Sequence, residues 1–497
     1  MVVGYWQESV PPGTDKLHLP MRFTIVPCLL LMVAVTQADD DEFRVYTEHP
    51  RLILTPQRLR LLKRERERDS KRWRQFDLLV KGSASLPEPG FALALYYAVS
   101  SDDAVGRRAV DWALGQGQDL RQLALVYDWC QPVLTTQQSS ALTAKIRKLS
   151  QEPAPMDGLA GIRDRALATI ATADDPKHPE EAPLTALIRV WWRGGFARSL
   201  ANGGAKPTLP EIYPLLEILH AIRDNLKMDL REAAPDYFMH LPKYLVIGNY
   251  PASYRAPEND FRIPMYLGSV DSSKAQPDLT RAALARAAGL SMVAYDTNGL
   301  ENQFLQGWLI QDRFSLMSLF GAPYEFLWAN PYQPGLSYFQ LPLVFHDQNT
   351  GALFVRSAWD EDADWFGLYG GEAELFRGGR ITVVNQGITT AGSTAPKPVQ
   401  IGETSVIFGR APLQFSTEGG AELVVGLKPQ YPYLVETDDE EMREIATDRA
   451  GTLVLEYPSG RTAGVRVHLG TTNTGAGAAT GAPNNAESEG KRGKEGA

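Results

Sequence analysis

The stretch at residues 249–266, NYPASYRAPENDFRIPMY, carries the densest set of side chains able to do acid–base chemistry. Tyr254 is followed directly by Arg255, and Asn249 and Arg262 lie in the same stretch. An unperturbed tyrosine has a pKa of about 10, and a neighbouring cation lowers that pKa, so Tyr254 is a candidate base. The alternative is a packed surface loop in which the arginines pair with the loop's own acidic residues.

A second group of ligand-binding types follows in residues 302–332. Gln306 and Arg313 are seven residues apart, so one face of a helix can carry both. Flat rings and amides together are typical of surfaces that stack on sugars and orient them. The candidate binding residues here are Gln306, Trp308, Arg313, Trp328, Asn330 and Tyr332. A helix core followed by packing between two domains would use the same side chains, and this alternative stays open.

A third candidate is the arginine pair in LIRVWWRGG. Arg189 and Arg193 are four residues apart and therefore share one face of a helix. Two guanidinium groups so placed could grip a carboxylate bidentately. The alternative is a pair of exposed arginines beside two core tryptophans.

Charge and composition limit the classes of partner. The 497-residue chain has a formal net charge of −9, so no general affinity for nucleic acid or anionic membrane is expected. An anionic ligand would need a local basic pocket. No phosphate-binding loop, dinucleotide fingerprint, nucleophile elbow or zinc-protease helix is present in the sequence. We therefore expect no nucleotide cofactor.

A targeting signal is predicted near the start, but not at Met1. From Met21 the chain has a basic residue, a 13-residue apolar core over 23–35 and small residues at Thr36 and Ala38. The core is too short to span a bilayer, so this pattern is a secretory signal with cleavage after Ala38. We expect Met21 to be the true start and a secreted or periplasmic protein. Cys28 falls in the signal, which leaves Cys130 alone, without a disulfide or a cysteine metal site.

Periodicity predicts two kinds of domain in sequence. A helical period dominates from residue 50 to about 320, with expected helices at 91–99, 103–115, 119–130, 136–150, 160–173, 184–200, 209–232, 280–297 and 300–320. Short apolar runs separated by turns follow from residue 341 and are typical of strands. The predicted regions are an extension plus signal at 1–38, a helical domain at 39–340, a β-domain at 341–469 and a disordered tail at 470–497.

Three segments, in order, resemble the heparinase II/III-like polysaccharide lyases. They are EHPRLILTPQRLRLL at 48–62, LRQLALVYDWCQPVLT at 120–135 and GALFVRSAWDEDADWFGLYGG at 351–371. The resemblance implies an incomplete (α/α) toroid followed by an antiparallel β-sandwich. It also implies an acidic polysaccharide as partner, cleaved by β-elimination. In such a site Tyr254, Arg255, Arg262 and Asn249 would be the catalytic group, with Arg189 and Arg193 gripping the uronate.

The sequence also departs from that family. The Asn-Asn-His-Gly segment of these lyases is missing, and so is the histidine-rich turn at which some members bind zinc. We therefore expect no metal. Two alternatives to a lyase stay open: a non-catalytic glycan-binding relative, and a toroid glycoside hydrolase using two carboxylates such as Asp312 and Glu325.

Overall fold

The structure is a computed structural model. It describes residues 43, 45–46, 48–82, 84–151, 158–173, 181–252, 270–271, 276–277, 279–311, 319–370, 372–383, 398–438 and 441–470. The predicted signal segment lies outside the described residues, as does the predicted tail at 470–497 apart from Gly470.

The first part of the described chain is helical. The α-helices are α1 (Pro56–Glu67), α2 (Lys71–Lys81), α3 (Pro89–Ser100), α4 (Asp103–Leu114), α5 (Leu120–Trp129), α6 (Thr136–Gln151), α7 (Leu159–Ala171), α8 (Glu181–Thr185), α9 (Ala197–Ala201), α10 (Leu209–Leu226), α11 (Pro235–Ile247), α12 (Leu279–Tyr295), α13 (Leu300–Gln311) and α14 (Gly321–Trp328). Short 3₁₀ turns are η1 (Gln131–Val133), η3 (Leu230–Ala233) and η4 (Tyr338–Gln340), and a π-helix, η2 (Ala186–Phe196), joins α8 to α9.

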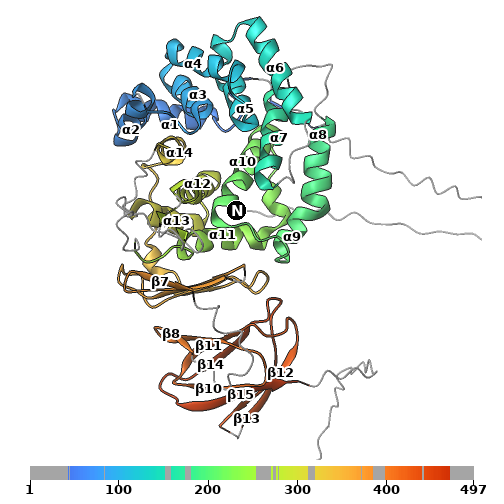
Figure 1. Cartoon of the computed structure of the whole chain (residues 1–497), viewed down its shortest axis with the longest axis vertical. Coiled ribbons are helices and arrows are strands. Elements are labelled where there is room, and N and C mark those ends of the chain that lie inside the picture. The colour runs from blue at the N-terminus through green and yellow to red at the C-terminus, as the bar shows by residue number, and fades with distance from the viewer. Residues whose placement is uncertain are drawn as a thin grey trace, which may run out of the picture. The chain divides into compact units, whose positions relative to one another are not determined.

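The helices follow one another around a ring (Figure 1). Helices α3, α5, α7, α10, α12 and α14 each pack on the next, and α14 packs on α2 and α3, which closes the ring. Strong local signals start these helices: Thr55 caps α1, and Thr208 and Glu211 form a capping box on α10. None of the described helices is long and apolar enough to cross a membrane.

The strands of the described residues form three larger sheets. The first holds β3 (Val344–His346), β4 (Leu353–Arg356), β5 (Trp365–Tyr369), β6 (Glu372–Arg377) and β7 (Arg380–Val383) in that order. The second has the order β14 (Leu453–Tyr457), β11 (Gly420–Val425), β9 (Thr404–Phe408) and β8 (Val399–Ile401). The third has the order β10 (Leu413–Thr417), β15 (Ala463–Leu469), β12 (Pro432–Thr437) and β13 (Glu441–Ala446). A two-residue pair, β1 (Val270–Asp271) and β2 (Gln276–Pro277), stands apart.

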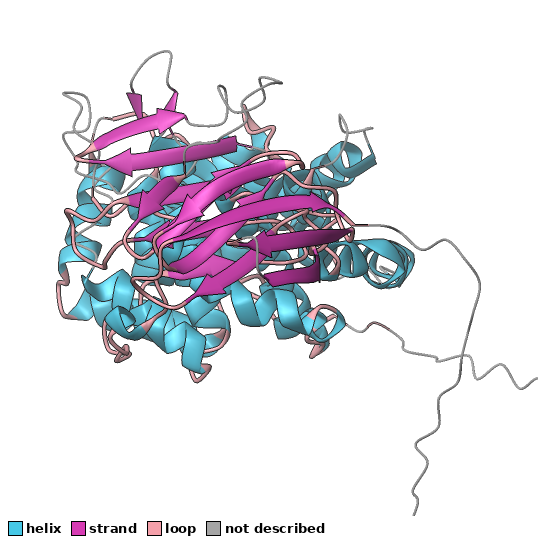
Figure 2. Cartoon of the chain, turned by 90° about the horizontal axis from the view of Figure 1, so that it is seen from below, coloured by secondary structure: helices cyan, strands magenta, loops and turns pink. Residues whose placement is uncertain are grey.

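The sheets share cores with their neighbours. Apolar residues of the first and second sheets pack together, and so do those of the second and third. The first sheet also joins the helical core: the Trp365 indole donates to the Ile247 carbonyl at 2.8 Å. Figure 2 shows the strands layered in front of the helices. The predicted fold class, a helical toroid followed by antiparallel sheets, is confirmed, with one exception: β9 and β11 pair in parallel.

Three details of the predicted elements were wrong. Helix α10 ends at Leu226, not 232, because Lys227 takes the left-handed conformation there. Helix α11 was not predicted at all, since Pro235 and Pro242 interrupt its pattern. Helix α14, from Gly321 to Trp328, lies beyond the last expected helix at 300–320 and was not predicted either.

Candidate functional site

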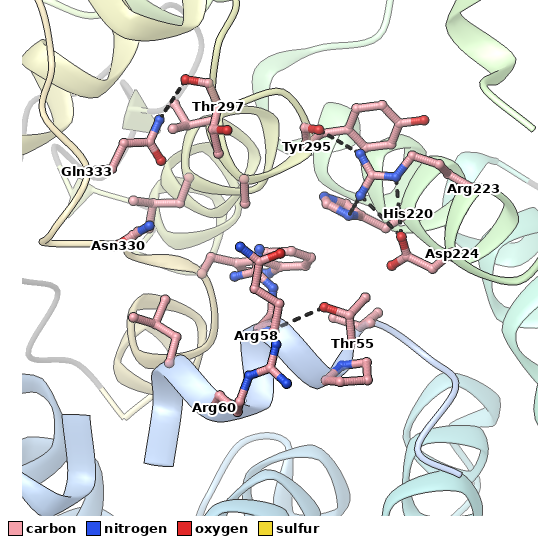
Figure 3. A pocket seen from close by; sticks show the side chains of 18 of the residues that line it. Thr55, Arg58, Arg60, His220, Arg223, Asp224, Tyr295, Thr297, Asn330 and Gln333 are labelled. Carbon is pink, nitrogen blue, oxygen red and sulfur yellow. Dashed lines mark hydrogen bonds and ion pairs between the residues drawn. The ribbon is translucent and has the colours of Figure 1, made fainter. Parts of the chain in front are cut away.

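A pocket of about 750 Å³ lies where α1 begins and where α10, α12 and α14 end. Four arginines line it: Arg58, Arg60 and Arg64 from α1, and Arg223 from α10. Asp224 is the one carboxylate among the described lining residues. Figure 3 shows the α1 side chains on one side of the pocket and those of α10 on another. The pocket is thus strongly basic in a chain whose net charge is −9.

One face of α10 brings polar groups to the middle of the ring. Tyr213, Glu217, His220 and Asp224 are spaced by four, three and four residues, and such spacing aligns side chains along one helix face. Tyr213, Glu217 and His220 are each 2% exposed or less. The last turn of this face, with Asp224 and its neighbour Arg223, reaches the pocket.

Arg223 connects the groups around it, as Figure 3 shows. Its Nη1 donates to the Tyr295 carbonyl at 2.6 Å, and its guanidinium lies 3.8 Å from the centre of the Tyr295 ring. Nε and Nη2 both donate to Asp224 Oδ1 at 3.2 Å. Because the Tyr295 carbonyl belongs to the end of α12, Arg223 satisfies a carbonyl that the helix itself leaves unpaired. Its charge is largely balanced by Asp224.

His220 has a defined tautomer. Its Nε2 lies 3.0 Å from the Ser291 carbonyl, which only accepts, so Nε2 carries the proton. Its Nδ1 lies 3.3 Å from Arg223 Nη2 and accepts from it. Burial lowers the pKa of His220 well below its ordinary value, and the charges of Arg58 and Arg223 act in the same direction. His220 is therefore a neutral ring with both nitrogens occupied.

Asp224 and Tyr295 hold their protons more tightly than usual. Burial raises the pKa of Asp224, although the charge of Arg223 opposes that rise. Asp224 Oδ2 is buried and has no hydrogen-bond partner among the described residues. The pKa of Tyr295 is also raised, first by burial and then by Asp229, to which its hydroxyl donates at 3.1 Å. The raised pKa keeps the Tyr295 hydroxyl protonated at neutral pH, and it makes the Asp224 carboxyl easier to protonate than an exposed one.

Arg58 contacts the end of α14. Its Nη1 donates to the Leu327 carbonyl at the end of α14, at 3.1 Å, and its guanidinium lies 4.5 Å from the centre of the Trp328 ring. Burial lowers the pKa of Arg58 to about 10, so the side chain keeps its charge at neutral pH. Arg58 thus brings a partly desolvated cation to the pocket, where it binds an anion more strongly than an exposed one would.

A buried ion network lies behind the pocket. Glu217 accepts from Arg121 Nη2 at 2.8 Å, from Arg163 Nη1 at 3.1 Å and from the Tyr213 hydroxyl at 2.7 Å. The same hydroxyl accepts from the Trp328 indole at 3.0 Å. The position of the Trp328 ring is therefore tied, through Tyr213, to this network.

Three of the residues predicted from the sequence come together here: Gln306, Trp328 and Asn330 all line the pocket. Gln306 Nε2 donates to the carbonyls of Asn330 and Gln333 at 3.0 Å each, which fixes the segment after α14. Trp328 lines the pocket, but it is 1% exposed and lies under Arg58, so its ring is packed in the core. This burial fits the packing alternative for the aromatic stretch, and the sugar-stacking alternative stays a prediction.

The other predicted residues are distributed more widely. Arg189 and Arg193 are exposed on the π-helix η2 and are not among the described lining residues. Asn249 is buried after α11 and donates to the Leu245 carbonyl at 2.8 Å. Trp308 is half-buried on α13, and Tyr332 is 46% exposed. Four predicted residues lie outside the described residues: Tyr254, Arg255, Arg262 and Arg313.

The sequence reading missed most of the basic side of the pocket. The arginines of α1 stand among acidic residues and read as a solvated helix face. His220, Arg223 and Asp224 lie in an otherwise apolar helical run. The sequence does contain a signal for them: polar residues recur every three or four positions within YPLLEILHAIRD. Such a polar stripe on an otherwise apolar helix indicates a specific role for that face.

Comparisons with known proteins leave the family open. No protein-family model matches the sequence, and no curated protein matches it. A solved structure described as a glycoside hydrolase aligns with a TM-score of 0.30 and 9% identity, covering 77% of this chain and 71% of its own. The heparan sulfate lyase HepC from Pedobacter heparinus aligns with a TM-score of 0.36 and 12% identity, covering 76% and 75%. Likenesses this weak carry no argument about chemistry.

Proposed function

We propose that the protein binds an acidic polysaccharide in the pocket between α1 and α10 and cleaves it by β-elimination, as a divergent relative of the heparinase II/III-like lyases. The observation that carries this proposal is the set of four arginines facing one carboxylate among the described lining residues. Arginine is always charged at neutral pH and matches carboxylate geometry with its planar fork. The pocket therefore favours a uronate over a neutral sugar.

The described groups fit part of the reaction. In β-elimination a base removes the proton beside the uronate carboxylate, a carbon–carbon double bond forms, and the bond to the leaving oxygen breaks. Arg58 would stabilise the enolate that develops on the carboxylate. Asp224, whose pKa is raised by burial, would protonate the leaving oxygen. Tyr254, outside the described residues, stays the predicted base.

The same pocket fits two-carboxylate hydrolysis poorly. Both common forms of glycoside hydrolysis use a pair of carboxyl groups flanking the scissile bond. Asp224 has no second carboxylate beside it among the described lining residues. Glu325, one of the pair considered from the sequence, is buried and bonded by Arg286 at 2.7 Å.

A second candidate function is glycan binding without cleavage. The observation in its favour is that His220 and Tyr295, the described pocket groups that could act as a base, both hold pKa values unsuited to that role. An intact arginine cluster without a working base would retain a uronate chain but not cut it.

A screen against uronate polymers separates these functions. We expect the purified protein to produce ultraviolet absorbance from an unsaturated uronate product. Reducing ends without that absorbance would indicate a hydrolase. Retardation in affinity gels without either product would indicate a binder. Absence of all three with hyaluronan, alginate, polygalacturonate and heparan sulfate would overturn the proposal.

We also propose that the protein is exported. The basic residue after Met21, the short apolar core and the small residues before Ala38 support this. N-terminal sequencing of the protein from the culture medium or periplasm should give a chain that starts after Ala38. A chain that keeps residues 21–38 in the cytoplasm would contradict the export proposal.

A further inference from the structure

A row of arginines leads away from the pocket along α1. Arg60 and Arg64 line the pocket, and Arg68 follows four residues later. The backbone N–H of Arg68 donates to the Arg64 carbonyl at 3.0 Å, so the helical path continues through it. Residues four apart on a helix lie on one face, about 6 Å apart along the axis. The three guanidinium groups therefore form a line that begins in the pocket.

The line ends at an aromatic ring. The Arg68 guanidinium lies 5.2 Å from the centre of the Tyr332 ring. The Tyr332 backbone N–H donates to the Asn330 side-chain oxygen at 3.2 Å, and the Tyr332 side chain is 46% exposed. Its chain neighbours Asn330 and Gln333 line the pocket. The pocket and the end of the row are thus both formed by α1 and by the segment that follows α14.

The acidic residues of this region do not neutralise the row. Glu65 is buried and paired with Arg72 at 2.9 Å, and Asp69 faces Arg74 at 3.7 Å. Within the part of the chain that the structure describes, Arg60, Arg64 and Arg68 take part in no ion pair. Glu65 and Asp69 are thus directed to other partners, and Glu67 is exposed and takes part in no ion pair among the described residues, so three arginines face at most one nearby carboxylate.

We propose that an anionic glycan chain extends from the pocket along α1, with successive acidic groups on Arg60, Arg64 and Arg68 and a sugar face against Tyr332. This inference rests on the proposed function, and it adds the path that the polysaccharide takes outside the pocket. An aromatic ring beside cations is a suitable surface for a sugar that carries charge on its edge and an apolar face. The row gives a longer chain more contacts than the pocket alone gives.

A length series tests the row separately from the pocket. The probes are oligogalacturonate dimers, tetramers and octamers, in which every sugar carries a carboxylate. We expect affinity to rise from dimer to octamer, and the rise to shrink with added salt because exposed charges are screened. Arg68→Gln and Tyr332→Leu should each weaken octamer binding by about fivefold, the scale of one exposed ion pair, and leave dimer binding unchanged.

The matched control is Arg108→Gln, which removes the same charge from an exposed position on α4. It should leave the affinity for all three probes unchanged. If the dimer binds as well as the octamer, or if the Arg68 and Tyr332 variants bind the octamer normally, the row has no role and the pocket proposal stands alone. If the dimer and the octamer both fail to bind, the row and the pocket proposal fall together for this class of glycan.

Discussion

Glu217→Gln is expected to lower the free energy of unfolding by about 3–5 kcal/mol, the cost of breaking a buried ion pair from one side. Glu217 is 0% exposed and accepts from Arg121, Arg163 and Tyr213. The substitution keeps the shape of the side chain but leaves two buried guanidinium groups short of a counter-charge. Because these partners come from α5, α7 and α10, the loss affects the contact between three helices of the ring.

Urea unfolding followed by far-ultraviolet circular dichroism measures this effect. The control is Glu232→Gln, the same change at an exposed position of η3, which should stay within about 0.5 kcal/mol of the unmodified protein. A Glu217→Gln variant as stable as the control would mean that the network contributes nothing, and that Glu88 and Asp164 are sufficient partners for the two arginines.

The same ion network predicts how the stability of the protein changes as the pH falls. Burial would raise the pKa of Glu217, but the charges of Arg121 and Arg163 outweigh burial and the pKa is lowered. A carboxyl with a lowered pKa in the folded state contributes stability above its unfolded pKa of about 4.3 and loses it as the pH falls through the folded value. The unmodified protein should therefore lose stability in acid more steeply than Glu217→Gln does.

The fold could be predicted because its signals are local. The apolar period, the caps of α1 and α10 and the change to short strands near residue 341 all act within a few residues. The pocket could not be predicted in the same way, because it depends on a contact between distant segments. Closure of the ring brings α1 next to α14, almost 270 residues later in the chain, where Arg58 donates to the Leu327 carbonyl. The pattern of apolar residues within either segment does not indicate that contact.

Tyr324, Phe326 and Trp328 show the same limit within one stretch. The residue types predict a flat aromatic surface, but burial assigns the first two to the core between α14 and its neighbours. Trp328 is equally buried, yet of the three it is the one that lines the pocket, with Arg58 over its ring. Which of several aromatic rings faces a ligand depends on what packs against each of them, and the sequence alone does not contain that information.

Arg58→Gln and Asp224→Asn are expected to move the affinity for an acidic oligosaccharide in opposite directions. Removing the Arg58 charge should weaken binding by about tenfold to a hundredfold, the worth of one hydrogen bond to a charged group in a partly desolvated site. Asp224→Asn removes the carboxylate from the same pocket and should tighten binding several-fold at neutral pH. If Asp224 is also the acid, this variant binds better and cleaves less.

The pH dependence of ligand affinity tests the roles of Asp224 and Arg58 independently. The pKa of Asp224 is raised by burial, so as the pH rises through it the pocket gains a negative charge and anion binding weakens. Asp224→Asn should abolish that step. The pKa of Arg58 is about 10, lowered by burial, so binding should fall again as the pH passes that value, and Arg58→Gln should lack this second step. Calorimetric titration with an oligogalacturonate across pH measures both.

Arg193→Gln is the variant that decides between the two locations for the site. The sequence places Arg193 in a carboxylate grip with Arg189, whereas the structure puts it on the exposed side of η2, outside the described lining of the pocket. If the pocket between α1 and α10 holds the ligand, Arg193→Gln binds normally while Arg58→Gln does not. The reverse result would move the site to η2 and make Arg58 only a cap for α14, detectable as a lower midpoint of unfolding without a change in affinity.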